Sequence, residues 1–137
     1  MIRILSVEDN VDLQRLLALA LADQDFEVHY AFTGPEGFEK ALALHPHVIL
    51  CDLMLPVYDG RELIGKLKAE GSVRDVPIVV ITAHYDSATL VEEEIRKLGV
   101  IEYLRKPVRT EDLVRVIRRV AAPPRPESQP PRPRAKP

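Results

Sequence analysis

Five side chains with the chemistry of a phosphoryl-transfer site follow short apolar runs in this chain. They are Glu8, Asp9, Asp52, Thr82 and Lys106. The apolar runs are typical of strands, and in an open parallel α/β sheet the functional crevice lies outside the carboxyl ends of the strands. The carboxylates, the hydroxyl and the ammonium group could therefore share one site that holds a divalent cation and a phosphoryl group.

The carboxylates of this set suit magnesium. Mg²⁺ takes near-octahedral oxygen ligands at about 2.0–2.1 Å and keeps several waters, so proteins usually supply one or two carboxylates beside a phosphoryl oxygen. Asp9 and Asp52 can supply the carboxylates, and Glu8 can act through a water molecule. The backbone carbonyl of Met54, just past Asp52, can add a further ligand. These four residues are the predicted metal site.

Asp52 is the predicted nucleophile, because aspartyl phosphate is established covalent chemistry of carboxylates. A bound metal offsets the repulsion between the carboxylate and an incoming phosphoryl group. Lys106 can neutralise phosphoryl oxygens as a point charge, and Thr82 can hydrogen-bond one of them. Each of these residue types alone is common at a helix start, a strand end or the surface, so the prediction depends on their occurring together in this order.

Short apolar runs alternate five times with segments of helical period, which indicates βαβ units around a parallel sheet. We expect strands over residues 2–7, 27–31, 48–51, 78–81 and 101–104. We expect helices over residues 11–22, from 33–35 to about 44, from 60 to about 69, over 87–98 and over 111–120. Strand 27–31 is polar at alternate positions and should lie nearer a sheet edge, whereas strand 78–81 should be covered on both faces.

Local signals set the expected ends and faces of the helices. Asn10 and Thr110 are predicted to cap the first and last helices, and Pro35 suits a first helical turn. Gly99 is predicted to end the fourth helix. The expected buried stripe of the first helix is Leu13, Leu16, Leu17 and Leu21.

The composition is that of an ordinary globular domain, with 46% hydrophobic residues, 29% charged residues and a net charge of −2 over 137 residues. Residues 1–120 hold 15 basic and 20 acidic side chains, so we do not expect this chain to bind nucleic acid. Cys51 is the single cysteine, which excludes an internal disulfide. Because the chain has neither a signal-peptide pattern nor an apolar run near the roughly 20 residues of a membrane span, we expect a cytoplasmic protein without membrane association.

One folded domain is predicted over residues 1–121. Residues 122–137 are rich in proline and mostly basic among their charges, so we expect a disordered tail or linker with polyproline II character. Pro-Pro-Arg-Pro occurs there twice, so a ligand for a proline-binding domain is the alternative to a simple linker.

Four stretches resemble the receiver domain of two-component response regulators, and the resemblance covers residues 2–120. The stretches are LSVEDN at 5–10, ILCDLMLP at 49–56 with DG at 59–60, VITA at 80–83 and YLRKP at 103–107. Their spacing strengthens the resemblance, because Asp9, Asp52 and Thr82 follow one another in the family's pattern. The resemblance implies a flavodoxin-like (βα)5 fold, a doubly wound parallel sheet of strand order 2-1-3-4-5, with the site at the switch point between strands one and three.

The resemblance also implies roles for individual residues. Asp52 would take a phosphoryl group from a phosphohistidine of a sensor histidine kinase or phosphotransfer protein, and Lys106 would pair with its oxygens. The metal would be Mg²⁺, for which Mn²⁺ could substitute. Thr82 and Tyr103 would move as the switch, and the Lys106–Pro107 peptide would be cis. The face formed by the fourth helix, fifth strand and fifth helix would then shift, to bind an output partner or a second copy.

The leading interpretation is a phosphorylation-dependent signalling switch rather than a turnover enzyme. An aspartate-nucleophile phosphatase is the alternative, but such sites usually have an acid two residues after the nucleophile, where this chain has Met54. A docking domain that has lost phosphorylation would show gaps in the set of site residues, and the sequence has none. The output could act by direct protein contact or through an effector domain missing from this chain.

Residues near the site give further expectations. Met54 and His84 cannot readily orient an attacking water, so we expect slow autodephosphorylation. Crowding of three acids predicts that the metal-free fold is destabilised and that Mg²⁺ raises the melting temperature. The acidic run Glu92–Glu94 and a long stretch from Thr82 to Gly99 leave the geometry of any dimer open.

Overall fold

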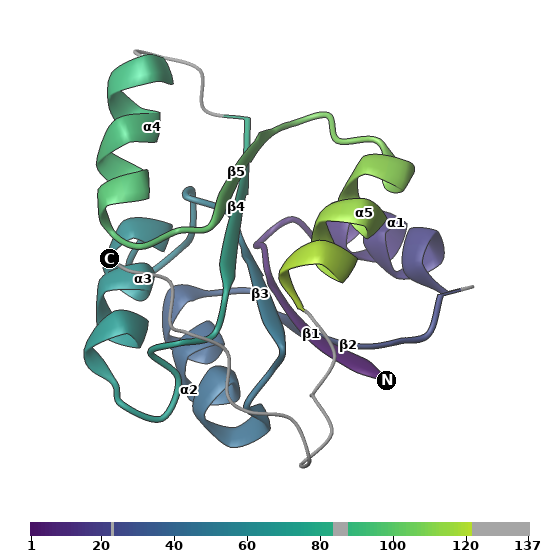
Figure 1. Ribbon diagram of the computed structural model, residues 1–137, viewed down its shortest axis with the longest axis horizontal. Coiled ribbons are helices and arrows are strands. Elements are labelled where there is room, and N and C mark those ends of the chain that lie inside the picture. Colours follow the sequence, from purple (N-terminus) through teal and green to yellow (C-terminus); the bar gives the residue numbers. More distant parts are fainter. Residues whose placement is uncertain (23, 84–87, 122–137) are drawn as a thin grey trace, which may run out of the picture.

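A five-stranded parallel sheet forms the centre of the computed structural model, which describes residues 1–22, 24–83 and 88–121, without the side chains of 88–91 (Figure 1). The strands are β1 (Ile2–Val7), β2 (Phe26–Ala31), β3 (Val48–Cys51), β4 (Ile78–Thr82) and β5 (Glu102–Arg105). Their order across the sheet is β2-β1-β3-β4-β5. The predicted order is therefore confirmed, and β2 lies at an edge, as its alternating polarity indicates.

Five helices connect the strands and cover both faces of the sheet. They are α1 (Val11–Leu21), α2 (Gly34–Leu44), α3 (Gly60–Ala69), α4 (Ala88–Lys97) and α5 (Thr110–Val120). Helices α1 and α5 lie on one face, and α2, α3 and α4 lie on the other (Figure 1). This two-sided arrangement confirms the predicted flavodoxin-like (βα)5 fold class.

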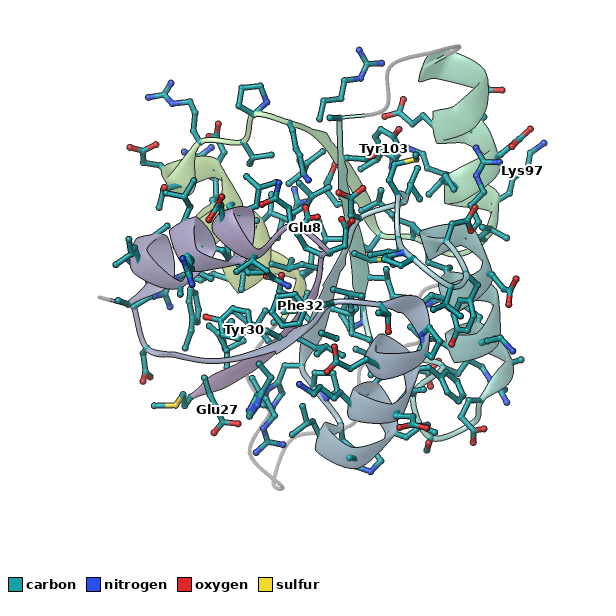
Figure 2. The ribbon with its side chains drawn as sticks, turned by 180° about the vertical axis from the view of Figure 1, so that it is seen from behind. Glu8, Glu27, Tyr30, Phe32, Lys97 and Tyr103 are labelled. Atoms are coloured by element: carbon teal, nitrogen blue, oxygen red, sulfur yellow. The ribbon has the colours of Figure 1, made fainter. Side chains whose placement is uncertain are left out.

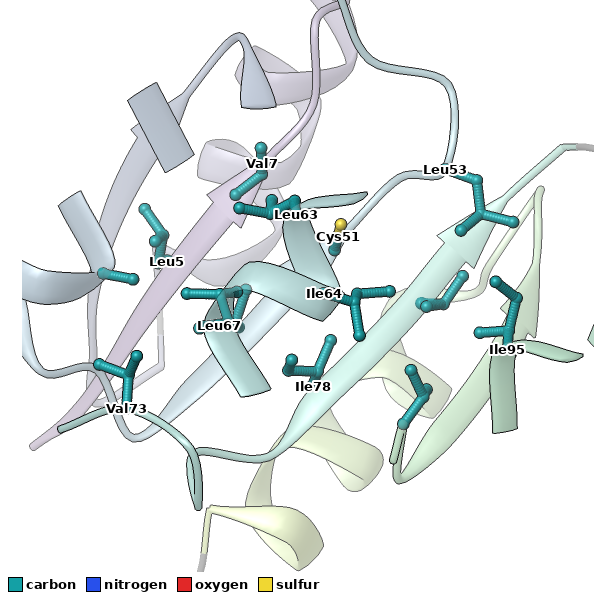
Figure 3. Close-up of a cluster of buried hydrophobic side chains, with 14 of the residues drawn as sticks. Leu5, Val7, Cys51, Leu53, Leu63, Ile64, Leu67, Val73, Ile78 and Ile95 are labelled. Carbon is teal, nitrogen blue, oxygen red and sulfur yellow. The ribbon is translucent and has the colours of Figure 1, made fainter. Parts of the chain in front are cut away.

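Strand β3 shows the physical reason for the continuously apolar sequence of the central strands. All four of its residues are buried, and their side chains alternate between two apolar clusters. Ile49 and Cys51 belong to the cluster shown in Figure 3, which packs under α2, α3 and α4. Val48 and Leu50 belong to the cluster under α1 and α5. A strand covered on both faces needs an apolar residue at every position.

Strand pairing brings the ends of β1 and β3 together at the switch point of the sheet. From β1 the chain passes to β2 on one side, and from β2 it returns to β3 on the other side of β1. Val7 and Cys51 are paired in register, so Glu8 and Asp52 follow directly from a paired position. The fold therefore places these two carboxylates side by side at the carboxyl edge of the sheet.

Most of the predicted helix ends are confirmed. The Asn10 side chain accepts a hydrogen bond from the Leu13 N–H at 3.1 Å, and Pro35 lies in the first turn of α2. Gly99 follows α4 with a φ of 95°, a left-handed conformation that suits glycine. The predicted cap Thr110 is wrong, because Thr110 is the first residue of α5 and the N-cap Arg109 makes no capping hydrogen bond with its side chain.

The predicted buried stripe of α1 is also partly wrong. Leu13 and Leu16 are exposed, whereas Gln14 and Leu21 are the buried residues of this helix. The leucines of α1 spread over more than half of the helix circumference, so their spacing does not define one narrow face. The polar Gln14 is buried because its amide group binds backbone carbonyls at the ends of β1 and β2.

The predicted tail, residues 122–137, lies outside the described residues, as does His84. Helix α5 ends at Val120 and Ala121 is the last described residue, so the domain boundary near residue 121 stays a prediction. In the described part of the chain, no helix has the length and apolar character needed to cross a membrane.

Candidate functional site

Three charged side chains meet at the carboxyl edge of the sheet. Lys106 Nζ donates a hydrogen bond to Asp52 Oδ2 at 2.7 Å and another to Glu8 Oε1. Asp52 and Glu8 are only 7% and 8% exposed, so both carboxylates lie below the surface beside the ammonium group. Lys106 is 54 positions from Asp52 and 98 from Glu8 in the sequence, so the cluster exists only in the folded chain.

Backbone hydrogen bonds fix the two carboxylates. The Asp52 N–H donates to the Val7 carbonyl at 3.1 Å, which extends the β1–β3 ladder past the strand end. Asp52 Oδ1 accepts from the Met54 N–H at 3.0 Å, and Glu8 Oε2 accepts from the Asn10 N–H at 3.1 Å. Each carboxylate therefore has one oxygen bound to the backbone and the other bound to Lys106.

Pairing of β4 with β5 brings Lys106 to the same edge. Thr82 is the register partner of Arg105, and the Lys106 N–H donates to the Thr82 carbonyl at 2.9 Å. The Lys106–Pro107 peptide bond is cis. The pairing thus continues one residue past β5 and carries the ammonium group toward Asp52.

A pocket of about 350 Å³ opens over these side chains. It is lined by Glu8, Asp9, Asn10, Leu13, Asp52, Met54, Ala83 and Lys106. Asp9 is exposed, whereas Asp52 lies at the buried end. All four predicted metal-binding residues therefore line one pocket, which has room for several water-sized groups.

Thr82 and Tyr103, the predicted switch pair, lie deeper than this pocket. Thr82 is fully buried and is not among the residues that line the pocket. Tyr103 is buried in the cluster of Figure 3, and Figure 2 shows it between the sheet and α4, away from Glu8. The Tyr103 hydroxyl is buried and has no hydrogen-bond partner in the described part of the chain. The tyrosine ring is thus turned inward in this structure.

Gln14 supports the site, although its sequence position does not single it out. Its Nε2 donates to the carbonyls of Ser6, Glu8 and Ala31 at 3.0, 3.2 and 3.1 Å, and its Oε1 accepts from the Ser6 hydroxyl at 2.8 Å. Because Gln14 binds the backbone of Glu8, it ties α1 to a residue that carries a site carboxylate. The only signal in the sequence is a lone amide within a leucine-rich helix.

Burial and neighbouring charges shift the pKa values of the cluster. Burial raises the pKa of Glu8 from 4.5 to about 7, although the hydrogen bond from Lys106 lowers it. Burial lowers the pKa of Lys106, but its hydrogen bonds to Asp52 and Glu8 outweigh burial and leave the pKa above its usual value. The ammonium group therefore stays charged at neutral pH, whereas the Glu8 carboxyl gains or loses its proton near neutral pH.

The raised pKa of Glu8 predicts a loss of stability as the pH rises through about 7. The folded protein holds the Glu8 proton more tightly than the unfolded chain, so the contribution is fully present below pH 4.5 and is lost by pH 8. Between pH 5 and pH 8, the wild type should lose about 2–3 kcal/mol relative to Glu8→Gln. Urea unfolding without metal measures this difference, and an unchanged difference would contradict the raised pKa.

The oxygen atoms of the pocket fit a magnesium ion, although the carboxylates are not already arranged around a metal position. In residues 1–22, 24–83 and 88–121, no group of three or more His, Cys, Asp or Glu side chains is arranged to hold a metal. The Lys106 ammonium group instead bridges Glu8 and Asp52. Mg²⁺ usually takes one or two carboxylates and keeps its waters, so Asp52, the exposed Asp9 and nearby backbone oxygens are sufficient donors.

Comparison with known proteins shows the family. The model of the response regulator receiver domain matches residues 4–118. The response regulator ArlR of Staphylococcus aureus is 35% identical over 120 residues, which cover 88% of this chain and 52% of ArlR. The hybrid signal transduction histidine kinase D of Dictyostelium discoideum is 35% identical over 111 residues, which cover 81% of this chain and 7% of the kinase. The chain thus spans about half of one relative and a small part of the other.

Solved structures of receiver proteins share the fold. The chemotaxis protein CheY4 of Vibrio cholerae is 27% identical, with a TM-score of 0.80 and coverage of 88% of this chain and 98% of CheY4. The receiver domain of the sensor histidine kinase PA1611 of Pseudomonas aeruginosa PAO1, which holds a magnesium ion in its active site cleft, is 29% identical, with a TM-score of 0.80 and coverage of 89% and 98%. Because the family model spans residues 4–118 and the strand order agrees, this chain belongs to the response regulator receiver domain family.

Proposed function

We propose that this chain is a phosphorylation-dependent signalling switch in which Asp52 accepts a phosphoryl group from a phosphohistidine. The observation that carries the proposal is the buried contact of Asp52 with Lys106, which also binds Glu8, at the switch point of the sheet. A phosphoryl group brings negative charge, and a fixed cation beside the acceptor is the group that stabilises it. Family membership makes the chain a signalling module rather than a metabolic enzyme.

The proposed step exchanges one bond to phosphorus for another. A carboxylate oxygen of Asp52 forms a bond to the phosphorus, and the P–N bond to the donor imidazole breaks. The electron pair of that bond stays on the imidazole nitrogen, which takes a proton from solvent. The products are an acyl phosphate on Asp52 and a neutral histidine on the donor.

Glu8, Asp9, Asp52 and the Met54 carbonyl would hold Mg²⁺, and Mn²⁺ should substitute because it also prefers oxygen ligands. When bound, the metal supplies positive charge that offsets the repulsion between carboxylate and phosphoryl oxygens. Lys106 would bind the phosphoryl oxygens, because its ammonium group already contacts the carboxylate that receives them.

Thr82 and Tyr103 would carry the change to the face formed by α4, β5 and α5. Phosphorylation adds about −1.5 to −2 charges at the end of the sheet, where Thr82 precedes the pocket residue Ala83. A hydrogen bond from Thr82 to the phosphoryl group would displace the end of β4. Because the Tyr103 hydroxyl has no hydrogen-bond partner among the described residues, no such bond would have to break when the ring moves.

Slow autodephosphorylation belongs to the same proposal, because Met54 offers no side-chain group that orients water.

A sensor histidine kinase or a phosphotransfer protein is the proposed donor. Helix α1 begins beside the site and exposes four large apolar side chains, which suit contact with a protein. They are Val11, Leu13, Leu16 and Leu19. The α4–β5–α5 face would bind an output partner or a second copy, or act on an effector domain. A cytoplasmic location is part of this proposal, because the ATP that charges such donors is found there.

Incubation with phosphoramidate and Mg²⁺ tests the proposal. The intact mass of the wild type should rise by one phosphoryl group, whereas Asp52→Asn should stay unmodified. Asp59→Asn is the matched control, because Asp59 lies close in sequence but caps α3 through the Arg61 and Glu62 N–H groups, and it should be labelled like the wild type. Equal labelling of Asp52→Asn and the wild type would reject the proposal.

A further inference from the structure

A second groove, larger than the pocket over the metal-binding residues, opens on the face of the sheet that α1 and α5 cover. Figure 1 shows these two helices side by side on that face. The groove measures about 530 Å³, and Asp52 and Lys106 lie at one end of it. Its walls are mostly aliphatic, and among the lining side chains are Leu13, Leu16, Leu17 and Ala20 of α1, Leu50 of β3 and Leu113 of α5.

The outer side of α1 continues this apolar surface. Leu16 and Leu19 are 61% and 74% exposed. A large apolar surface beside a groove is typical of an interaction site. A phosphohistidine donor would contact α1 only while transfer takes place. Another segment can therefore cover the groove and the exposed leucines between transfers.

The described chain ends on this same face of the sheet. Ala121 is buried and belongs to the apolar cluster that also contains Leu21 of α1 and Leu113 of α5. Helix α5 has 11 residues, so it is about 16 Å long, and its first residue, Thr110, lines the groove. Residue 122 therefore follows a position about one helix length from the groove.

Residues 122–137 are long enough to reach the groove and suited to its walls. A polyproline II segment rises about 3.1 Å per residue, so these 16 residues span about 50 Å, roughly three times the length of α5. Seven of them are proline. Proline rings are apolar, and their restricted backbone loses little conformational entropy on binding, which is why proline-rich segments bind apolar grooves.

The charges of this segment and of the groove are opposite. Residues 122–137 hold four basic side chains and one acidic side chain, a net charge of +3. The groove and the exposed start of α1 hold four carboxylates against two basic groups, a net charge of −2. These groups are Glu8, Asp9, Asp12 and Asp52 on the acidic side and Arg15 and Lys106 on the basic side.

We propose that residues 122–137 bind back into this groove and cover α1 and the approach to Asp52. The prolines would pack on the leucines, and the basic side chains would lie near the carboxylates. Because the segment is joined to α5, its effective concentration at the groove is about millimolar, so weak contacts are sufficient. A donor protein would have to displace the segment, whereas a small phosphodonor reaches Asp52 through the pocket lined by Asp9 and Met54. This effect on transfer rests on the proposed phosphoacceptor function of Asp52.

A nitroxide spin label on Ser128→Cys locates the segment in the full chain. Ser128 lies between the two Pro-Pro-Arg-Pro repeats, and the label should attach there because Cys51 is buried. The amide NMR signals of residues 16–20 in α1 should broaden more than those of residues 61–68 in α3, which covers the other face of the sheet (Figure 1). Equal broadening of both helices, or none, would overturn the proposal.

Two comparisons show whether the groove of the same chain is the binding site. Leu16→Ser should at least halve the broadening of α1, whereas Ile101→Ser should keep it, because Ile101 is an exposed apolar residue that does not line the groove. A mixture of spin-labelled chains with isotope-enriched chains that carry no label should show no broadening. Broadening in that mixture would overturn the proposal, because the segment would then bind a second copy.

Replacing Pro130, Pro131 and Pro133 with serine tests the effect on transfer without changing the charge. The broadening of α1 should weaken, and transfer from a phosphotransfer protein that labels the wild type should become at least about threefold faster. Labelling by phosphoramidate should change by less than about twofold. Ala122→Ser combined with Ala135→Ser is the matched control, because it keeps every proline and charge of the segment.

Unchanged transfer in the proline variant would overturn the claim that the segment covers the approach to Asp52. A wild type that phosphoramidate does not label would instead reject the proposed function, and the NMR signals of α1 would still decide where residues 122–137 bind.

Discussion

Replacing Lys106 with methionine is expected to destabilise the metal-free protein by about 3–5 kcal/mol at pH 8. The ammonium group binds both Asp52 and Glu8, and both carboxylates are buried. Without it, two buried carboxylates face each other and lose the cation that both contact. Removing one partner of a buried ion pair costs more than the intact pair contributes, because the remaining charge stays desolvated. Urea unfolding of the wild type and Lys106→Met measures this loss.

Two further comparisons separate this electrostatic effect from lost packing. Lys106→Met combined with Asp52→Asn should recover most of the stability, because only one carboxylate remains. Lys97→Met removes an exposed lysine of α4, labelled in Figure 2, and should change the unfolding free energy by less than about 0.5 kcal/mol. If Lys106→Met is no less stable than Lys97→Met, the buried ion pair does not stabilise the fold.

Lys106 also corrects the expectation that crowded acidic side chains destabilise the metal-free fold. The sequence alone predicts three carboxylates that repel one another without a metal. In the structure, Lys106 bridges two of them and Asp9 is exposed to solvent, so much of that repulsion is already offset. Any rise in melting temperature with Mg²⁺ should therefore come from binding of the metal to the folded state rather than from relief of a strained metal-free fold.

The position of the site could be predicted because it depends on strand ends rather than on side-chain packing. Glu8, Asp52 and Lys106 each follow an apolar run, and parallel pairing brings such ends to one edge. The strand order itself required the resemblance, because five alternating strands and helices fit more than one order. The Mg²⁺ assignment used only residue types and spacing, so it could not foresee that Lys106 bridges two of the carboxylates.

Features that depend on particular contacts could not be predicted. The leucines of α1 spread over more than half of the helix circumference, so periodicity alone did not reveal that Leu16 is exposed and Gln14 is buried. The burial of Gln14 depends on three backbone carbonyls that lie outside its own helix. Val57, with a φ of 71°, is a second case, because valine in a sequence does not signal a positive φ as glycine or asparagine does. The loop that holds Val57 is fixed by tertiary contacts instead.

Gly60→Ala is expected to lower the unfolding free energy by about 1–3 kcal/mol and to slow phosphoramidate labelling of Asp52 by roughly 100-fold. A Cβ at residue 60 would lie 2.4 Å from the Asp52 carbonyl oxygen and 2.8 Å from the Leu53 Cα. Both are backbone atoms that cannot rotate away, so the segment that carries the phosphoacceptor has to move. Even a shift of about 1 Å misplaces the attacking carboxylate relative to its partners.

Gly65→Ala is the matched control for this prediction, because Gly65 lies in the same helix and its Cβ would meet nothing within 4 Å. There the usual preference for alanine should raise the unfolding free energy by about 0.5–1 kcal/mol and leave labelling unchanged. Opposite signs for the two variants would show that the close approach of α3 to Asp52, rather than helix propensity, requires glycine at residue 60. If Gly60→Ala were as stable and as readily labelled as Gly65→Ala, the start of α3 would not position the phosphoacceptor.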